Sequence, residues 1–330
     1  MKLGNEDTVF VTGGSGTIGR KILAILKQRG IPTKALARSD KSARVVENLG
    51  AQAVAGDLLD PTALSSGMRR TSYLIHAAAD TSHGIASIEQ DEVNLQGTRN
   101  VYAAALAAGV RRGVHLSSES VLLNGQALHN ADERIPIPSL FAGGYSQSKA
   151  ESEKIALEAS SAELEVVVVR PRFVWGLGDT TALPQLIEAA QSGKLAWIGG
   201  GRYRTSTTHL ENVVEGVLLA LERGGAGEVY FISDGEPVEF RDFITRLLNT
   251  QGVVVPPKEV PRWLVKIVAR SSDLIAKLSA GRLSGPMSWQ EYATLGVEVT
   301  LNIDKARNEL GYTPVMTVAE GLAELEAANT

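Results

Sequence analysis

Residues 9–19 read Val-Phe-Val-Thr-Gly-Gly-Ser-Gly-Thr-Ile-Gly, and they carry the clearest structural pattern of the chain. An apolar strand runs into a glycine-rich turn, and helical spacing then continues to Arg29. In a turn that binds a dinucleotide, one glycine makes the tight bend, one lets the backbone approach the pyrophosphate, and one lets helix and strand pack closely. The free N–H groups at the start of the helix face the phosphates. A glycine-rich turn between a strand and a helix therefore predicts cofactor contacts at Gly13, Gly16, Thr17, Ile18 and Gly19.

Outward from this turn, apolar strands alternate with helical patterns through the first half of the chain. Strands are predicted at residues 8–11, 33–37, 51–55, 73–77, 113–116 and 166–170, and helices at 19–29, 42–49, 93–108 and 145–160. Continuous apolar strands that alternate with helices are typical of a parallel sheet covered on both faces. We therefore expect an α/β fold, with a doubly wound parallel sheet of the Rossmann type over residues 1–170.

The pattern changes after Arg170, where the loops lengthen. Helices are predicted near residues 182–192, 213–222 and 240–248, and strands near 196–198 and 228–233. The alternation of strand and helix is broken here, so we expect residues 171–330 to form a smaller C-terminal substrate-binding lobe. This lobe is expected to interleave with the end of the sheet.

The composition excludes several kinds of site. The 330 residues include no cysteine, which removes disulfides, thiolate metal centres and cysteine nucleophiles. The five histidines have no metal-ligand spacing, so we expect no metal. A formal net charge of −4 does not suit a nucleic-acid partner. The polar start of the chain, with no apolar run near the ~20 residues of a membrane span, predicts a cytoplasmic protein.

The end of the second predicted strand indicates which nucleotide is bound. NAD sites usually place an acidic residue there to bind the ribose 2′-hydroxyl, whereas Ala37 and Arg38 stand at this point. An arginine suits a 2′-phosphate, so we expect NADP in preference to NAD, with NAD as the alternative. Asp57 and Leu58 end the third strand and are expected to contact the adenine. A solvated surface role for Arg38, and a turn or cap role for Asp57, remain the alternatives.

A Tyr-x-x-x-Lys motif at Tyr145 and Lys149 falls on a predicted helix, where one turn places both side chains on the same face. An unperturbed tyrosine is a poor base at neutral pH, and a neighbouring cation is expected to lower its pKa. Ser118 lies just past the fifth strand, at the sheet edge where open α/β sheets bind ligands. Its hydroxyl is the candidate to bind the substrate oxygen, with Ser117 and Ser120 as rivals.

Several stretches resemble, in order, the extended short-chain dehydrogenase/reductase family. They are TGGSGTIG, GDLLD, HAAAD, VNLQGTRNV, LSSESV, YSQSK and RPRFVWGLGD. The resemblance spans essentially the whole chain. It implies an enzyme with a catalytic triad of Ser118, Tyr145 and Lys149, and it favours Ser118 over the two rival serines.

The same resemblance implies further contacts and a quaternary state. Ala77, Ala78 and Ala79 would line the cofactor, and Pro171 to Val174 would contact the nicotinamide carboxamide. Asn94 would tie its helix to the active-site loop. Members of the family typically dimerise through two helices, which here are residues 93–108 and 145–160, so we expect a homodimer.

Motifs in the second half of the chain limit the class of substrate that we expect. Nucleotide-sugar epimerases and dehydratases typically carry an arginine four residues before the histidine that corresponds to His209, and Thr205 stands there instead. Arg204 is one position away and Arg202 three, so we expect the phosphate clamp to be absent or shifted.

Stretches within residues 178–243, and later residues 310–322, are similar to the 3β-hydroxysteroid dehydrogenase branch, which includes sterol-4α-carboxylate 3-dehydrogenases and 2-alkyl-3-ketoalkanoate reductases. This resemblance implies an NAD(P)-dependent enzyme that interconverts a secondary alcohol and a ketone on a hydrophobic small molecule. A nucleotide-sugar epimerase or dehydratase, and a non-catalytic NADP-binding regulator, are the alternatives.

Residues 262–278 combine apolar side chains with four basic ones, in a helical pattern. Three interpretations stand: a lid or wall of the substrate pocket, an amphipathic helix packed on the second lobe, or an interfacial helix that contacts a membrane surface.

Overall fold

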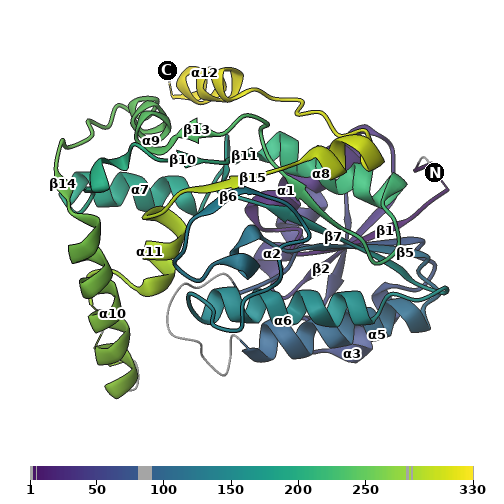
Figure 1. Ribbon diagram of the computed structural model, residues 1–330. Coiled ribbons are helices and arrows are strands. Elements are labelled where there is room, and N and C mark those ends of the chain that lie inside the picture. Colours follow the sequence, from purple (N-terminus) through teal and green to yellow (C-terminus); the bar gives the residue numbers. More distant parts are fainter. Residues whose placement is uncertain (1–2, 5, 81–90, 280–281, 284, 330) are drawn as a thin grey trace.

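The computed structural model describes residues 3–4, 6–80, 91–279, 282–283 and 285–329 (Figure 1). Its centre is a seven-stranded sheet in the order β12-β7-β5-β4-β1-β2-β3, and every neighbouring pair is parallel. The strands are β1 (Val9–Thr12), β2 (Thr33–Ala37), β3 (Gln52–Ala55), β4 (Tyr73–His76), β5 (Arg112–Leu116), β7 (Glu165–Pro171) and β12 (Val229–Ile232). The predicted α/β fold with a doubly wound parallel sheet is confirmed.

Helices cover both faces of this sheet, because successive strand residues point to opposite sides. Val9 and Val11 belong to a core cluster with residues of α1 and α8, whereas Phe10 belongs to a second cluster with residues of α3 and α5. One face carries α1 (Thr17–Gln28), α2 (Asp40–Asn48) and α8 (Leu210–Arg223). The other carries α3 (Pro61–Gly67), α5 (Gly97–Ala107), which follows the π-helical η1 (Glu92–Gln96), and α6 (Gly144–Glu158).

The second half builds smaller sheets beside the main one. A four-stranded sheet has the order β13-β10-β15-β6, and two pairs join β11 with β8 and β14 with β9. These strands are β6 (Leu128–Ala131), β8 (Val174–Trp175), β9 (Trp197–Ile198), β10 (Arg204–Thr205), β11 (Thr208–His209), β13 (Val238–Glu239), β14 (Glu259–Val260) and β15 (Val299–Leu301). β12, from the second half of the chain, is a strand of the main sheet, and β6, from the first half, is a strand of the four-stranded sheet. The division of the chain into two domains at residue 170 stays a prediction.

The remaining helices are α7 (Ala182–Gln191), α9 (Phe240–Asn249), α10 (Arg262–Leu278), α11 (Trp289–Leu295) and α12 (Val318–Ala328), with short turns at η2 (Glu119–Leu122), η3 (Gly199–Gly201) and η4 (Ala306–Leu310). A third core cluster lies among α7, α9 and α12 and is rich in aromatic residues, with Trp175 and Trp197 almost fully buried. No helix in the described part of the chain is long and apolar enough to cross a membrane.

α10 projects away from the body of the protein (Figure 1). Its packed side consists of Val265, Ala269, Ser272 and Ala276, which are small or β-branched. The large apolar side chains point outward: Trp263 is 65% exposed and Leu278 is 81% exposed, and Leu264, Ile267, Leu274 and Ile275 are also exposed. The helix thus packs on α11, in the second half of the chain, through these small residues, whereas the lid and membrane-surface interpretations stay predictions.

Candidate active site

The glycine-rich turn joins β1 to α1 and lies against the end of β4. Gly13 has a φ of 74°, and a Cβ there would lie 2.7 Å from the backbone nitrogen of Ala78. At Gly19 a Cβ would lie 2.1 Å from the carbonyl oxygen of Gly13. Gly16 is the N-cap of α1 and carries no side chain to cover the free N–H groups behind it. The turn thus leaves bare backbone at a helix N-terminus, which is the cradle that a pyrophosphate requires.

Thr17 and Ile18 begin α1 beside this cradle. The Thr17 hydroxyl lies 2.7 Å from that of Thr180, so the start of α1 is linked to the loop that precedes α7. Ile18 packs partly into the main core. Both side chains contact other parts of the protein, so the backbone N–H groups of these residues are what the start of α1 could offer to a phosphate.

Arg38 is exposed and directly follows β2, as the sequence predicts. Asp57 is also exposed, and its carboxylate accepts a hydrogen bond of 2.8 Å from the Leu59 backbone, as in a turn. Leu58 is buried instead, and its side chain packs against Gly97. Asp60, not Asp57, caps α3. Arg38 and Asp57 thus both lie just beyond the carboxyl ends of the adjacent strands β2 and β3, and their contacts with a ribose and an adenine stay predictions.

Ala77, Ala78 and Ala79 follow β4 and are half-buried. The Ala78 backbone N–H donates to the Thr12 hydroxyl at 3.2 Å, which fixes this segment against the glycine-rich turn. The Asn94 side chain exchanges two hydrogen bonds with the Asp80 backbone and donates to the Ser148 hydroxyl at 3.2 Å. Asn94 therefore connects the end of β4 with α6, and the link to an active-site loop that the family resemblance implies stays a prediction.

Tyr145 and Lys149 lie one turn apart on α6. The helix begins at Gly144, and Gln290 of α11 accepts from the Ser146 backbone N–H at 3.2 Å. The Lys149 ammonium group is buried and donates to the Leu116 carbonyl at 2.8 Å, at the end of β5. The motif therefore lies at the carboxyl end of the sheet, directly beside the loop that carries Ser118.

The pKa values of this pair follow from burial. Burial lowers the pKa of Lys149 to about 8, although the Glu153 carboxylate one turn later acts in the opposite direction. Burial, together with the nearby Glu119 charge, raises the pKa of Tyr145 to about 12. The expectation that a neighbouring cation lowers the pKa of Tyr145 is therefore wrong for this structure, because desolvation of the phenol outweighs other influences.

The three candidate serines have different surroundings. The Ser117 hydroxyl donates to the buried Glu153 carboxylate at 2.6 Å. The Ser118 hydroxyl caps η2, accepting from the Ser120 backbone, and donates to Glu119 at 2.8 Å. Hydrogen bonds with the side chains of Ser118 and Ser120 both act to lower the pKa of Tyr145. The geometry removes Ser117 as a rival, whereas the choice of Ser118 over Ser120 rests on the family pattern.

Pro171 ends β7, and Val174 begins β8 one short loop later. Phe173 between them has a φ of 41°, which is unusual for a residue with a side chain and is typical of strained functional loops. Its ring packs edge-on against Phe240 and Phe243. Packing of the aromatic lobe therefore holds the backbone that would meet the nicotinamide.

Thr205, at the position of the arginine clamp of sugar-nucleotide enzymes, is buried, and its hydroxyl accepts from Arg172. Arg204 points elsewhere and donates to the Pro237 carbonyl. No group of three or more histidine or acidic side chains suited to a metal ion exists among the described residues. This side of the site thus lacks a phosphate clamp at residues 204 and 205.

Sequence reasoning missed the charged residues around the site. Arg170 and Glu153 form one buried ion pair, and Arg172 and Glu119 form another. Their partners lie 17 and 53 residues apart in the chain, respectively. The only local signal was that charged residues interrupt the apolar stretches around Ser118 and Pro171.

Comparison with known proteins places this geometry in a family. The family model of the 3-beta hydroxysteroid dehydrogenase/isomerase family matches residues 10–261. A 4-hydroxy-2-methyl-3-oxo-4-farnesyl-3,4-dihydroquinoline-1-oxide ketoreductase of Stigmatella aurantiaca is 44% identical, with 97% of this chain and 96% of that protein covered. A decarboxylating sterol-4-alpha-carboxylate 3-dehydrogenase of Dictyostelium discoideum is 32% identical, with 96% and 99% covered.

The fold of this chain is also similar to that of a solved structure. The dTDP-glucose 4,6-dehydratase from Streptomyces venezuelae, crystallised with NAD, superimposes with a TM-score of 0.76 at 23% identity. The alignment covers 97% of this chain and 96% of that one. The chain thus belongs to the 3-beta hydroxysteroid dehydrogenase/isomerase family and is an NAD(P)-dependent oxidoreductase of the extended short-chain dehydrogenase/reductase type.

Proposed function

We propose that this enzyme is an NADP-preferring reductase that interconverts a ketone and a secondary alcohol on a hydrophobic small molecule. The observation that carries the proposal is the meeting of Ser118, Tyr145 and Lys149 at the carboxyl end of the sheet, beside the bare glycine turn. The bound nicotinamide would supply or accept the hydride. Ser118 and Tyr145 would hold the substrate oxygen.

The protonation states favour a proton donor. A Tyr145 pKa of about 12 keeps the phenol protonated at neutral pH, so that it can donate its proton to the oxygen of a ketone under reduction. Lys149, with a pKa of about 8, retains enough positive charge near neutral pH to bind a ribose hydroxyl of the coenzyme. The Ser118 hydroxyl would position the ketone by a second hydrogen bond.

The preference for NADP is supported by Arg38, which is exposed at the end of β2 where an NAD enzyme usually has an acid. The preference for a hydrophobic substrate is supported by the relatives, since the name of one specifies a farnesyl-substituted quinoline and the name of another a sterol. The Thr205 hydroxyl already accepts a hydrogen bond from Arg172, which counts against a phosphate clamp for a nucleotide sugar at this position. A nucleotide-sugar epimerase or dehydratase is the second candidate, because the fold is similar to that of a dTDP-glucose 4,6-dehydratase.

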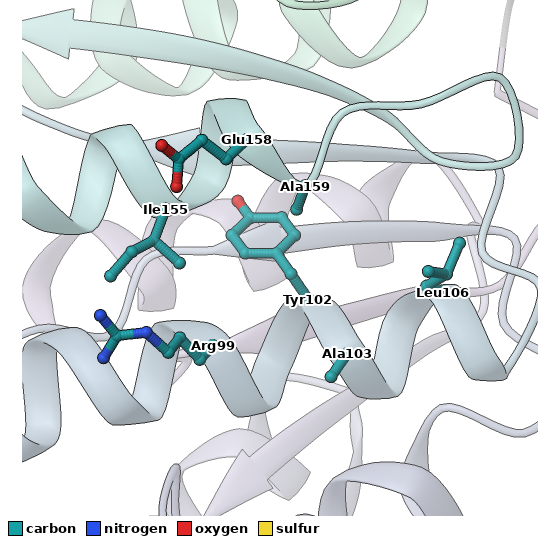
Figure 2. A pocket seen from close by; sticks show the side chains of 7 residues that line it. All are labelled: Arg99, Tyr102, Ala103, Leu106, Ile155, Glu158 and Ala159. Atoms are coloured by element: carbon teal, nitrogen blue, oxygen red, sulfur yellow. The ribbon is translucent and has the colours of Figure 1, made fainter.

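The proposal extends to two partners. A pocket of about 320 Å³ between α5 and α6 is lined by Arg99, Tyr102, Ala103, Leu106, Ile155, Glu158 and Ala159 (Figure 2), and we infer that a second copy of the chain covers this face.

The exposed apolar side of α10 is unsuited to water, and the neighbouring cations Lys266, Arg270 and Lys277 suit anionic lipid. We infer that α10 contacts a membrane surface.

The test is Tyr145→Phe, which removes the transferred proton and little else. We expect ketone reduction to fall by about 10²–10⁴-fold, the usual contribution of a general acid, while NADPH still binds. Steroid ketones, 2-alkyl-3-oxoalkanoates and UDP-sugars should be assayed in parallel with NADPH and NADH by coenzyme absorbance. Unchanged turnover in the variant refutes the assignment. Turnover of UDP-sugars without net coenzyme consumption favours the epimerase alternative.

A further inference from the structure

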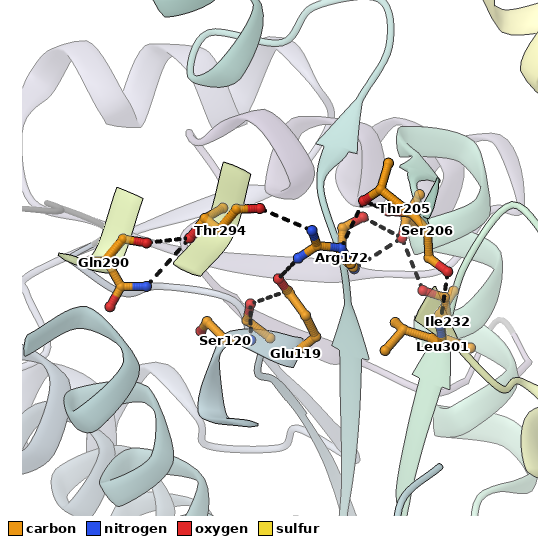
Figure 3. Close-up of polar contacts among 11 residues, drawn as sticks. Glu119, Ser120, Arg172, Thr205, Ser206, Ile232, Gln290, Thr294 and Leu301 are labelled. Carbon is orange, nitrogen blue, oxygen red and sulfur yellow. Dashed lines mark hydrogen bonds and ion pairs between the residues drawn. The ribbon is translucent and has the colours of Figure 1, made fainter. Parts of the chain in front are cut away.

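Glu119 directly follows the candidate catalytic serine, and it is almost entirely buried. One of its carboxylate oxygens accepts from the Ser118 hydroxyl at 2.8 Å, and the other accepts from Arg172 at 2.6 Å. Figure 3 shows Glu119 between the η2 turn and the Arg172 guanidinium. A single carboxylate thus links a candidate catalytic group to a buried cation.

Arg172 is fixed from three directions. Besides Glu119, it donates to the Thr205 hydroxyl at 3.1 Å and to the Thr294 carbonyl at 3.0 Å, so β10, α11 and η2 all hold it (Figure 3). Only 1% of its surface is exposed. The carboxylate of Glu119 therefore has a rigid counter-ion and cannot turn away from Ser118 without leaving that cation buried and unpaired.

A buried ion pair of this kind adds little to stability, because the cost of removing two charges from water is similar to their mutual attraction. An apolar pair would fill the same space at a similar free energy. The position of the pair is more informative than its strength, since the Glu119 charge also acts on the neighbouring Tyr145 phenol. Glu119 is therefore electrostatically close to one candidate catalytic group and hydrogen-bonded to another.

We propose that Glu119, held by Arg172, is a positioning residue that fixes the Ser118 hydroxyl for the substrate oxygen. This inference rests on the proposed function. The Ser118 hydroxyl donates to Glu119, and rotation about its C–O bond would turn the same proton to the oxygen of a ketone. The carboxylate would thus hold the serine side chain near the position from which it binds the substrate.

The first experiment compares Glu119→Gln with the wild type. The amide keeps the size of the side chain and removes the charge, and charge-assisted hydrogen bonds are about twice as strong as neutral ones. We expect kcat for ketone reduction to fall about 10-fold, with KM and the Kd for NADPH within about 2-fold. An unchanged kcat overturns the proposal.

The second experiment separates positioning from stability. Glu119→Gln leaves Arg172 unpaired and lowers Tm, whereas Glu119→Gln combined with Arg172→Met removes both charges and restores Tm toward the wild-type value. We expect kcat of the double variant to stay low, because a neutral amide still holds Ser118 less strongly than the carboxylate does. Recovery of kcat together with Tm would show that the pair is only structural.

The third experiment tests whether Glu119 acts through Ser118. In a Ser118→Ala background, we expect Glu119→Gln to cost less than about 2-fold in kcat, because the group that it positions is gone. Losses that multiply overturn the proposal. If the wild type reduces no ketone at all, the proposed function fails, and the same cycle is then measured in unfolding free energy. In that measurement, strictly additive losses of unfolding free energy would show that Ser118 and Glu119 do not interact.

Discussion

At the scale of single residues, Gly19 determines whether the coenzyme turn can form. A Cβ at this position would overlap the carbonyl oxygen of Gly13, and no flexible side chain is available to move aside. We expect Gly19→Ala to lower the free energy of unfolding by about 1–3 kcal/mol, as overpacking does, and to abolish binding of either coenzyme. Thermal unfolding and fluorescence titration measure the two effects.

Gly113→Ala is the matched control for that substitution. Gly113 is buried in β5, and a Cβ there would meet its nearest neighbour at 3.4 Å, an ordinary contact. We expect this variant to unfold and bind NADPH like the wild type. Equal losses in both variants would show that any added methyl group disturbs the sheet, and that Gly19 has no particular role in the turn.

Arg38 is the residue on which the choice of coenzyme depends. We expect Arg38→Ala to weaken NADPH binding by about 10–100-fold, since one or two charged hydrogen bonds to the 2′-phosphate are lost, and to leave NADH binding nearly unchanged. Fluorescence titration with both coenzymes measures the ratio. Arg44→Ala, on the exposed side of α2, controls for general loss of positive charge. Equal weakening of both coenzymes contradicts the prediction.

The site residues that could be predicted are those whose partners are close in the chain. Tyr145 and Lys149 share one helical turn, and Ser118 follows a recognisable strand. Arg172 and Gln290 could not be predicted, because they contact Glu119 and Ser146 only after distant segments come together. The raised pKa of Tyr145 has the same origin, since burial is a property of the folded chain.

At the scale of secondary-structure elements, α10 has an apolar side that no described part of the protein covers. We expect the wild type to sediment with vesicles that contain anionic lipid at low salt, and Trp263→Ser combined with Ile267→Ser to sediment much less. Neutral vesicles and high salt should weaken binding, because the basic residues contribute through electrostatic attraction. No sedimentation of the wild type with anionic vesicles at low salt contradicts the proposed membrane contact.

Most of the long elements could be predicted, because period and length agree over many residues. The short strands β6, β10, β13 and β15 could not, since none exceeds a few residues and their pairing joins distant segments. The sequence predicts the helical nature of residues 262–278, and the structure bears this out. Which side of that helix faces inward depends on its contact with α11, which local periodicity does not specify.

At the scale of the whole molecule, α5 and α6 present the face that we expect a second copy to cover. Leu106 is 48% exposed at the rim of the pocket between them. We expect the wild type to be a dimer by light scattering, and Leu106→Glu to shift it toward the monomer, because a buried charge in an apolar interface is costly. Leu140→Glu, exposed elsewhere, is the control. A monomeric wild type contradicts the prediction.

The position of β12 at the edge of the main sheet has a consequence for synthesis of the chain. β7, with four consecutive valines, pairs with β5 on one side and with β12 on the other, and β12 is made only after the segment that holds β8 to α8. Until then, an apolar strand edge with free backbone groups is exposed, and such edges recruit other chains. A fragment that ends at residue 170 would keep this edge permanently and should aggregate, whereas supplying the remaining residues as a separate chain would cover it.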